Sequence, residues 1–218
     1  MEPTAWPGVW REGRALYTRN AEPGRRVYGE ALRIADGTEY REWDPFRSKL
    51  AALLAKGPPA SVLTPPTSVL YLGASHGTTA SHLSDLWPTA RLYLVEKSPT
   101  SFAPLLALAR RRTNLLPILA DAQLPERYLA DVGEVDLLYQ DVAQRDQARI
   151  FVGNAAAALA EGGRGILMLK VRSVTQRRPA AVVAREARRE LVSGGLRVEA
   201  EVPLAPFSRE HVALVVSR

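Results

Sequence analysis

A regular alternation of apolar stretches and helical patterns fills the chain from Ser68 to its end, and it constrains the fold more than any other feature. Buried-strand patterns occupy residues 68–73, 91–96, 115–120, 135–141 and 163–170, and helical patterns at 81–87, 99–110, 144–160 and 179–193 lie between or after them. Such an alternation predicts an α/β fold with a doubly wound, mostly parallel sheet. Two more β-like stretches, 196–204 and 210–217, predict an antiparallel edge.

Residues 1–58 follow a different pattern. Apolar and polar residues alternate through 9–20 and 25–44 around turn residues, which predicts a small antiparallel sheet. A short helical pattern over 46–57 follows, and four prolines between 58 and 66 predict a linker or a stiff turn. We therefore predict a β-rich N-terminal domain over 1–58 and a doubly wound domain over 59–218.

Composition narrows the class of protein. No apolar run approaches the ~18 residues of a membrane span, and the N-terminus lacks a signal-peptide pattern, so we expect a cytoplasmic protein without membrane partners. The chain has no cysteine, and its 3 histidines show no metal-ligand spacing, so we expect no metal site. The net charge of +6 favours an anionic partner such as RNA or DNA, although a basic surface without a specific ligand remains an alternative.

A glycine turn follows the first strand of the predicted parallel sheet, within YLGASHGTTASHLSD at 71–85. Such a turn, between a strand and a helix, is where doubly wound sheets bind nucleotides. Gly73 can adopt backbone conformations closed to other residues, and we expect Gly77 to let the chain approach a ligand closely. The spacing is neither that of a dinucleotide fold nor that of a P-loop. Taken alone, it fits a purely structural turn equally well.

Three consecutive strands end in an acid at the same edge of the predicted sheet. Glu96 lies 19 residues after Gly77, where a carboxylate can accept hydrogen bonds from ribose hydroxyls, and Asp121 and Asp141 end the next two strands. We expect Asp121 to accept a hydrogen bond from the exocyclic amine of an adenine. The acids could instead be caps at loop entries. An adenosine ligand without phosphates fits them best, and S-adenosylmethionine is the common cofactor of that kind.

Long sequence blocks then carry a family resemblance. They include LYTRNAEPGRRVYGE (16–30), YREWDPFRSKLAA (40–52), VLYLGASHGTTASHLSD (69–85), LVEKSP (94–99), PILADAQLPERY (117–128), YQDVAQRDQA (139–148), LKVRS (169–173) and PFSREHVALV (206–215). Over nearly its whole length the chain resembles the fibrillarins in their archaeal form. The resemblance implies an S-adenosylmethionine-dependent 2′-O-methyltransferase of rRNA and tRNA that works within a box C/D ribonucleoprotein.

The resemblance also implies residues for the cofactor. Thr78 and Thr79 would lie along its methionine part, Glu96 and Lys97 at the ribose, Asp121 and Ala122 at the adenine, and Asp141, Val142, Ala143 and Gln144 at the methyl end. The sequence departs from the family pattern at His76, where a small residue is usual, and at Lys97, where an aromatic is common. We expect the His76 side chain to point to solvent.

The catalytic set implied by the resemblance is Lys49, Asp141, Lys170 and His211. Lys170 would be nearest the 2′-hydroxyl, as base or as stabiliser of the developing alkoxide, and a neutral lysine there would need its pKa lowered by burial or by a cation such as Lys49. Asp141 would orient Lys170 and the methyl group. His211 would relay or orient a proton.

Basic residues suggest where RNA arrives. Arg172, Arg177 and Arg178 follow the fifth strand and could hold RNA phosphates, although they also fit a solvated helix start. The resemblance implies that a guide RNA selects the target RNA, delivered with a Nop-domain scaffold protein and a ribosomal-type protein that binds kink-turns. Two alternatives stay open: a methyltransferase acting on glutamine side chains of proteins, and a non-catalytic ribonucleoprotein subunit.

Overall fold

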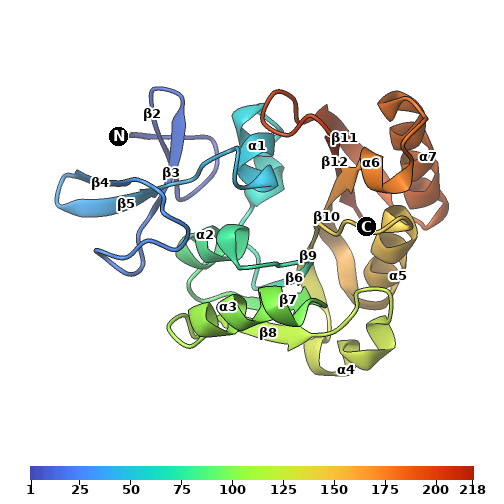
Figure 1. The fold of residues 1–218 in the computed structure, drawn as a ribbon, viewed down its shortest axis with the longest axis horizontal. Helices are drawn as coiled ribbons and strands as arrows, with labels where there is room; N and C mark the ends of the chain where they lie inside the picture. The colour runs from blue at the N-terminus through green and yellow to red at the C-terminus, as the bar shows by residue number, and fades with distance from the viewer.

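Two β-sheets form the frame of the protein in a computed structural model that describes residues 1–218 (Figure 1). The N-terminal sheet has the strand order β1-β2-β3-β5-β4 and is antiparallel throughout. Its strands are β1 (Glu2–Pro3), β2 (Val9–Glu12), β3 (Ala15–Arg19), β4 (Leu32–Ala35) and β5 (Thr38–Glu42). Asp36 and Gly37 join β4 to β5 with φ of 49° and 73°, the left-handed conformation that a two-residue hairpin turn requires.

The main sheet has the strand order β11-β12-β10-β9-β6-β7-β8. Its strands are β6 (Ser68–Leu72), β7 (Arg91–Glu96), β8 (Leu115–Leu119), β9 (Val135–Gln140), β10 (Leu159–Lys170), β11 (Arg197–Pro203) and β12 (His211–Ser217). The five from β10 to β8 run parallel, whereas β12 is antiparallel to both β10 and β11. The predicted doubly wound sheet with an antiparallel edge is confirmed.

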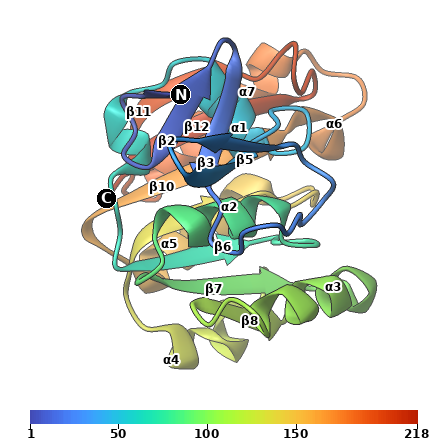
Figure 2. The same cartoon turned by 90° about the vertical axis from the view of Figure 1, so that its left-hand side faces the viewer.

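Helices cover both faces of the main sheet (Figures 1 and 2). Leucines of α1 (Lys49–Ala55), α2 (Thr78–Leu86) and α3 (Pro99–Ala109) belong to the core on one face. The core on the other face includes residues of α4 (Leu129–Val132), α5 (Gln147–Ala158) and α7 (Ala180–Ser193), and α6 (Val171–Val174) follows β10 directly. None of the helices combines the length and the apolar character needed to cross a membrane.

The N-terminal sheet shares the first of these cores. Trp6 and Trp43 belong to the same cluster of buried apolar residues as Ile166 and Val215 of the main sheet. The proline-rich segment is ordered against this core rather than being a free linker: it contains a short 3₁₀ helix, η1 (Ala60–Leu63), whose Val62 and Leu63 are buried. The predicted boundary between 1–58 and 59–218 therefore divides the chain by topology, while one core spans it.

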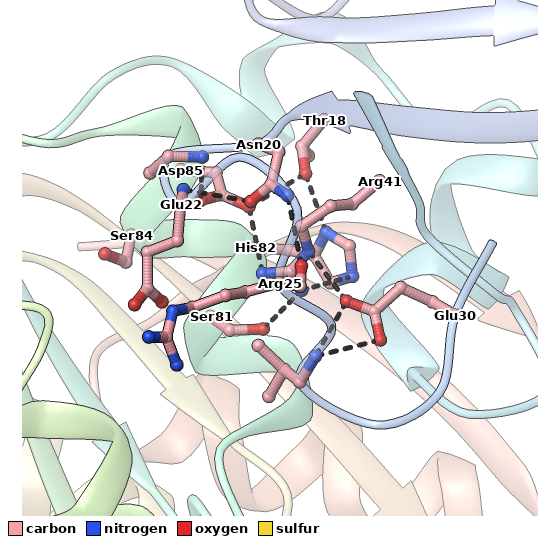
Figure 3. Close-up of polar contacts among 12 residues, drawn as sticks. Thr18, Asn20, Glu22, Arg25, Glu30, Arg41, Ser81, His82, Ser84 and Asp85 are labelled. Carbon is pink, nitrogen blue, oxygen red and sulfur yellow. Dashed lines mark hydrogen bonds and ion pairs between the residues drawn. The ribbon is translucent and has the colours of Figure 1, made fainter. Parts of the chain in front are cut away.

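A buried polar network joins the N-terminal sheet to α2 (Figure 3). Arg41 is fully buried, and its guanidinium contacts Glu30 at 2.8 Å, Asp85 at 3.3 Å and Ser81 at 2.8 Å. His82 lies beside it, fully buried, with its ring nitrogens hydrogen-bonded to hydroxyl groups of the N-terminal part. Paired charges of this kind satisfy one another inside the protein, so the network fixes the position of α2 against the sheet.

Most predicted elements are confirmed, and the differences have local reasons. The segment 25–30 forms no strand, because Glu30 turns back to accept hydrogen bonds from the backbone N–H groups of Val27 and Tyr28. The second helix begins at Thr78, three residues before the predicted start, because Gly77 takes the left-handed conformation (φ +89°) at its N-cap. The strand predicted from residue 163 begins already at Leu159.

Candidate active site

The carboxyl ends of β6, β7, β8 and β9 surround a cavity of about 290 Å³, which we call the strand-end cavity. Of the predicted cofactor residues, it is lined by Gly73, Glu96, Lys97, Ala122, Asp141, Val142, Ala143 and Gln144. These residues come from four different strand ends, those of β6, β7, β8 and β9, which the parallel register brings to one edge of the sheet. The structure thus brings together most of the set that the sequence indicated.

Glu96 is held in place by the glycine turn and the start of α3. Its side chain accepts hydrogen bonds from the backbone N–H groups of Ser75 and Ser98, both at 2.8 Å, and the residue is only 9% exposed. Each carboxylate oxygen has a second lone pair, so the group can still accept from a diol in the cavity. A fixed acceptor at this depth suits recognition of ribose hydroxyls.

Asp121 lies at the rim of the strand-end cavity rather than in its wall. Its neighbours Ala120 and Ala122 line the cavity, while its carboxylate accepts hydrogen bonds from the side chain of Gln144 at 3.0 Å and from the backbone of Gln123. Burial acts to raise the pKa of Asp121, but these hydrogen bonds and the Lys97 ammonium outweigh it and lower the pKa. The group is therefore an anion that anchors Gln144 and Lys97.

The two positions of the turn, 73 and 77, require glycine for different structural reasons. Gly73 has φ +82°, and a Cβ atom there would lie 2.4 Å from the backbone oxygen of Asp141. Gly77 was predicted to give a ligand room; instead, a Cβ there would meet Leu108 and Leu105 of α3. Gly73 thus sets the spacing between two strand ends at the cavity, whereas Gly77 sets the packing of α2 on α3.

A second cavity of about 270 Å³, the lysine cavity, adjoins the first and shares four lining residues with it, namely Gly73, Ser75, Asp141 and Ala143. All four predicted catalytic residues line it: Lys49, Asp141, Lys170 and His211. Thr78 and Thr79 at the start of α2 face this second cavity. His76 is exposed as predicted, at the edge of the same cavity.

Asp141 forms an ion pair with Lys49, whereas the family resemblance gave it the role of orienting Lys170. The Lys49 Nζ to Asp141 Oδ2 distance is 2.7 Å, and no contact of the Lys170 ammonium with Asp141 falls within ion-pair distance. The reason is geometric: Lys49 is the first residue of α1, which packs on one face of the main sheet, and its side chain reaches Asp141 at the end of β9. Burial raises the pKa of Asp141, and the Lys49 and Lys170 ammonium groups oppose that rise.

His211 faces the two lysines as a neutral ring. Burial, together with Lys49 and Lys170, lowers its pKa to about 3. Its Nδ1 atom lies 2.8 Å from the Ser208 hydroxyl, while Nε2 is buried without a partner in the protein. An unpartnered buried nitrogen is costly unless something in the cavity engages it. His211 lines the lysine cavity, so a substrate bound there would lie against its ring.

The three predicted RNA-binding arginines lie beyond Lys170. Arg172 lines a groove next to Lys170 and contacts Glu210 at 3.6 Å. Arg177 and Arg178 line the next groove together with Arg172, and Arg178 also pairs with Glu186 of α7. The first groove shares Ala143 and Lys170 with the lysine cavity, and the second shares Arg172, Gln176 and Glu210 with the first, so a cationic surface leads outward from the cavity.

Several residues of the two cavities were not singled out from the sequence. Ser75, Ser98 and Ser101 line the strand-end cavity, and Arg47 and Tyr71 line the lysine cavity. Ser75 and Arg47 lie within the sequence blocks that carried the family resemblance, so the sequence could have indicated them as site residues. Tyr71 also lies in such a block, but it belongs to the predicted strand 68–73, and only the fold shows that it lines the lysine cavity.

These residues fit an adenosine-containing cofactor. The strand-end cavity offers a buried carboxylate, the small apolar walls of Ala122 and Val142, and an amide at Gln144. Apolar walls with a few fixed polar groups are what such ligands require. The doubly wound sheet, its antiparallel edge and this cavity define an S-adenosylmethionine-dependent methyltransferase.

Comparisons with known proteins give the family. The fibrillarin family model matches residues 5–218. A fibrillarin-like rRNA/tRNA 2′-O-methyltransferase of Methanothermobacter thermautotrophicus is 43% identical over 97% of this chain and 94% of its own. The chain belongs to the fibrillarin family.

Solved structures agree. The crystal structure of Aeropyrum pernix fibrillarin with natively bound S-adenosyl-L-methionine superposes with a TM-score of 0.89 at 41% identity, covering 99% of this chain and 96% of that one. A fibrillarin/Nop5p complex contains a chain with a TM-score of 0.86 at 36% identity, with both chains covered fully (100%). The fold inferred from the sequence is therefore that of the family.

Proposed function

We propose that this protein transfers the methyl group of S-adenosylmethionine to ribose 2′-hydroxyls of rRNA and tRNA. One observation carries the proposal: Lys49, Asp141, Lys170 and His211 line one cavity, and that cavity shares a wall with the strand-end cavity. The relatives are named as rRNA/tRNA 2′-O-methyltransferases, which supports the same chemistry here.

The strand-end cavity would hold the cofactor. Glu96 would accept from the ribose, Ala122 and Val142 would flank the adenine with Asp121 at its edge, and Gln144 and Ala143 would lie toward the sulfonium. Gly73, Thr78 and Thr79 would lie along the methionine part. When bound, S-adenosylmethionine supplies an electrophilic methyl group, so the protein must chiefly align the acceptor hydroxyl.

Lys170 would act on the acceptor. Its side chain enters the lysine cavity from the end of β10, where it can take the proton of the 2′-hydroxyl or stabilise the developing alkoxide. The Lys49–Asp141 pair leaves Lys170 without a carboxylate partner. An unpaired amine is free to approach the hydroxyl of the substrate.

His211 would orient the acceptor as a neutral ring. Because its pKa lies at about 3, it carries no charge at physiological pH, and Nε2 can exchange a hydrogen bond with the ribose. Ser208 on Nδ1 restrains the ring orientation.

RNA would approach over the cationic surface of Arg172, Arg177 and Arg178, whose contacts with phosphates carry no sequence information. We therefore infer that a guide RNA selects the target, and that a Nop-domain scaffold and a kink-turn-binding protein deliver it. The fibrillarin/Nop5p complex supports the scaffold. Efficient, guide-independent methylation by the isolated chain would contradict this assembly.

Product analysis tests the proposal. The chain is incubated with methyl-labelled S-adenosylmethionine, guide RNA, target RNA and the two partner proteins, and the product is digested with ribonuclease or protease. We expect the label in RNA, at one ribose, and its loss when that target nucleotide is 2′-deoxy. Label that only protease releases would indicate a protein methyltransferase, and no label would indicate a non-catalytic subunit.

A further inference from the structure

Gln147, a residue outside both cavities, makes two hydrogen bonds to the backbone of Lys170. Its Oε1 accepts from the Lys170 N–H at 2.8 Å, and its Nε2 donates to the Lys170 carbonyl at 3.0 Å. The residue is the first of α5 and is 1% exposed. A side-chain amide that meets both groups of one peptide residue imitates the pairing of a neighbouring strand.

The strand pairing explains why Lys170 needs such a partner. Lys170 lies opposite His211 in the β10–β12 ladder, and the next residue, Val171, donates its N–H to Glu210 on that side. Backbone groups alternate between the two sides of a strand, so those of Lys170 point toward β9. The β9–β10 ladder ends at Leu167 and Gln140, so no strand is left to pair with Lys170.

A second buried amide extends the contact to Asp141. The Gln140 side chain donates from Nε2 to the Gln147 backbone carbonyl at 2.7 Å, and Gln140 is fully buried. Gln140 directly precedes Asp141. Two amides thus connect the strand end that carries Asp141 with the strand end that carries Lys170.

We propose that Gln147, supported by Gln140, is a positioning residue that sets the place of Lys170 relative to Asp141 and the acceptor hydroxyl. The inference rests on the proposed role of Lys170. Gln147 touches neither cavity, so it acts only through the backbone of Lys170. A displacement of about 1 Å at a reacting group lowers rates on the order of 10²-fold.

The test compares Gln147→Met with wild type and with Phe151→Leu in the reconstituted ribonucleoprotein. Methionine keeps the side-chain length and removes both hydrogen bonds. Phe151 is a fully buried residue of the same helix that has no hydrogen bond to Lys170, so its substitution controls for loss of stability. The measurements are the single-turnover rate of methyl transfer, the S-adenosylmethionine affinity and the melting temperature.

We expect Gln147→Met to lower the single-turnover rate on the order of 10- to 100-fold while the cofactor affinity changes by less than about twofold. Phe151→Leu should melt earlier and keep its rate at temperatures well below melting. An unchanged rate in Gln147→Met, or an equal loss in Phe151→Leu, would overturn the inference.

Gln147→Glu gives a readout that a purely structural role would not move. An ionised glutamate accepts from the Lys170 N–H but repels its carbonyl, whereas the protonated form restores the donor. The protonated fraction of any carboxyl grows as pH falls, and burial moves this titration to higher pH by raising the pKa. The ratio of variant rate to wild-type rate should therefore rise toward acidic pH. A ratio independent of pH would contradict the positioning role.

A Lys170→Ala variant separates this inference from the proposed function. If Lys170→Ala retains turnover, the proposed function of Lys170 fails, whatever Gln147 does. If Lys170→Ala loses turnover and Gln147→Met does not, only the positioning role fails. If Lys170 acts on the acceptor and Gln147 positions it, adding Gln147→Met to Lys170→Ala should lower the residual rate no further, since the two changes act on one group.

Discussion

At the scale of residues, the lysine cavity contains one ion pair, Lys49–Asp141, and one lysine without an ion-pair partner, Lys170. Lys49 and Asp141 neutralise one another at 2.7 Å, with their side chains 29% and 17% exposed. Lys170 is left without an ion-pair partner, and His211 is neutral because its pKa lies at about 3. One lysine side chain without an ion-pair partner therefore faces the space where the acceptor hydroxyl would lie.

The neutral histidines make stability depend on pH. Burial, with Arg41 and Arg112, holds the pKa of His82 well below 6.5, and that of His211 is about 3. In the unfolded chain both would protonate near pH 6.5, so below that pH the unfolded state binds more protons and the free energy of unfolding falls as pH falls. Each such histidine contributes about 1.4 kcal/mol per pH unit.

A His211→Gln variant isolates one of these contributions. Between pH 6 and 5, its free energy of unfolding should decline with a slope about 1.4 kcal/mol per pH unit shallower than that of wild type. Urea unfolding at a series of pH values measures both slopes. Identical slopes would mean that His211 titrates normally in the folded protein.

At the scale of elements, the β6–α2 turn sets how closely the ends of β6 and β9 approach. Gly73 combines φ +82° with a close approach to the Asp141 carbonyl, so Gly73→Ala brings both backbone strain and a clash. We expect a loss of about 1–3 kcal/mol in stability and a weakened cofactor affinity, because Asp141 must move.

Gly37→Ala is the matched control. Gly37 also has positive φ (+73°), in the β4–β5 hairpin, but a Cβ there would meet nothing within 4 Å. It should share the backbone strain and leave cofactor affinity unchanged. Thermal melts and isothermal titration with S-adenosylmethionine measure both effects. Equal affinities in the two variants would show that Gly73 does not shape the cavity.

The strands and helices also show which features could be predicted from the sequence and which could not. The parallel strands and their acidic ends could be predicted from the apolar runs and the helices between them. Strands connected in this way run parallel, so their carboxyl ends lie at the same edge of the sheet. The partner of Asp141 could not, since Lys49 arrives from α1, and only the packing of that helix decides which lysine meets the carboxylate. The contact of Gln147 with Lys170 could not be predicted for a similar reason, because it depends on the residue at which the β9–β10 ladder ends.

At the scale of the molecule, the N-terminal part is structurally tied to the site. It shares a core with the main sheet, and Arg41 reaches Ser81 (Figure 3). The Ser81 hydroxyl in turn donates to the carbonyl of Thr78, which lines the lysine cavity. Lys49 follows directly from this part of the chain. The N-terminal sheet thus supports both the glycine turn and one member of the catalytic set.

The most direct test of the central claim is single-turnover methyl transfer by the assembled ribonucleoprotein, measured for wild type and Lys170→Ala beside their affinities for S-adenosylmethionine. The account predicts affinities within about twofold and a rate lower by on the order of 10²–10⁴-fold in the variant, the range associated with losing a group that handles the proton. Undiminished transfer by Lys170→Ala would contradict the assignment of the lysine cavity as the site of reaction.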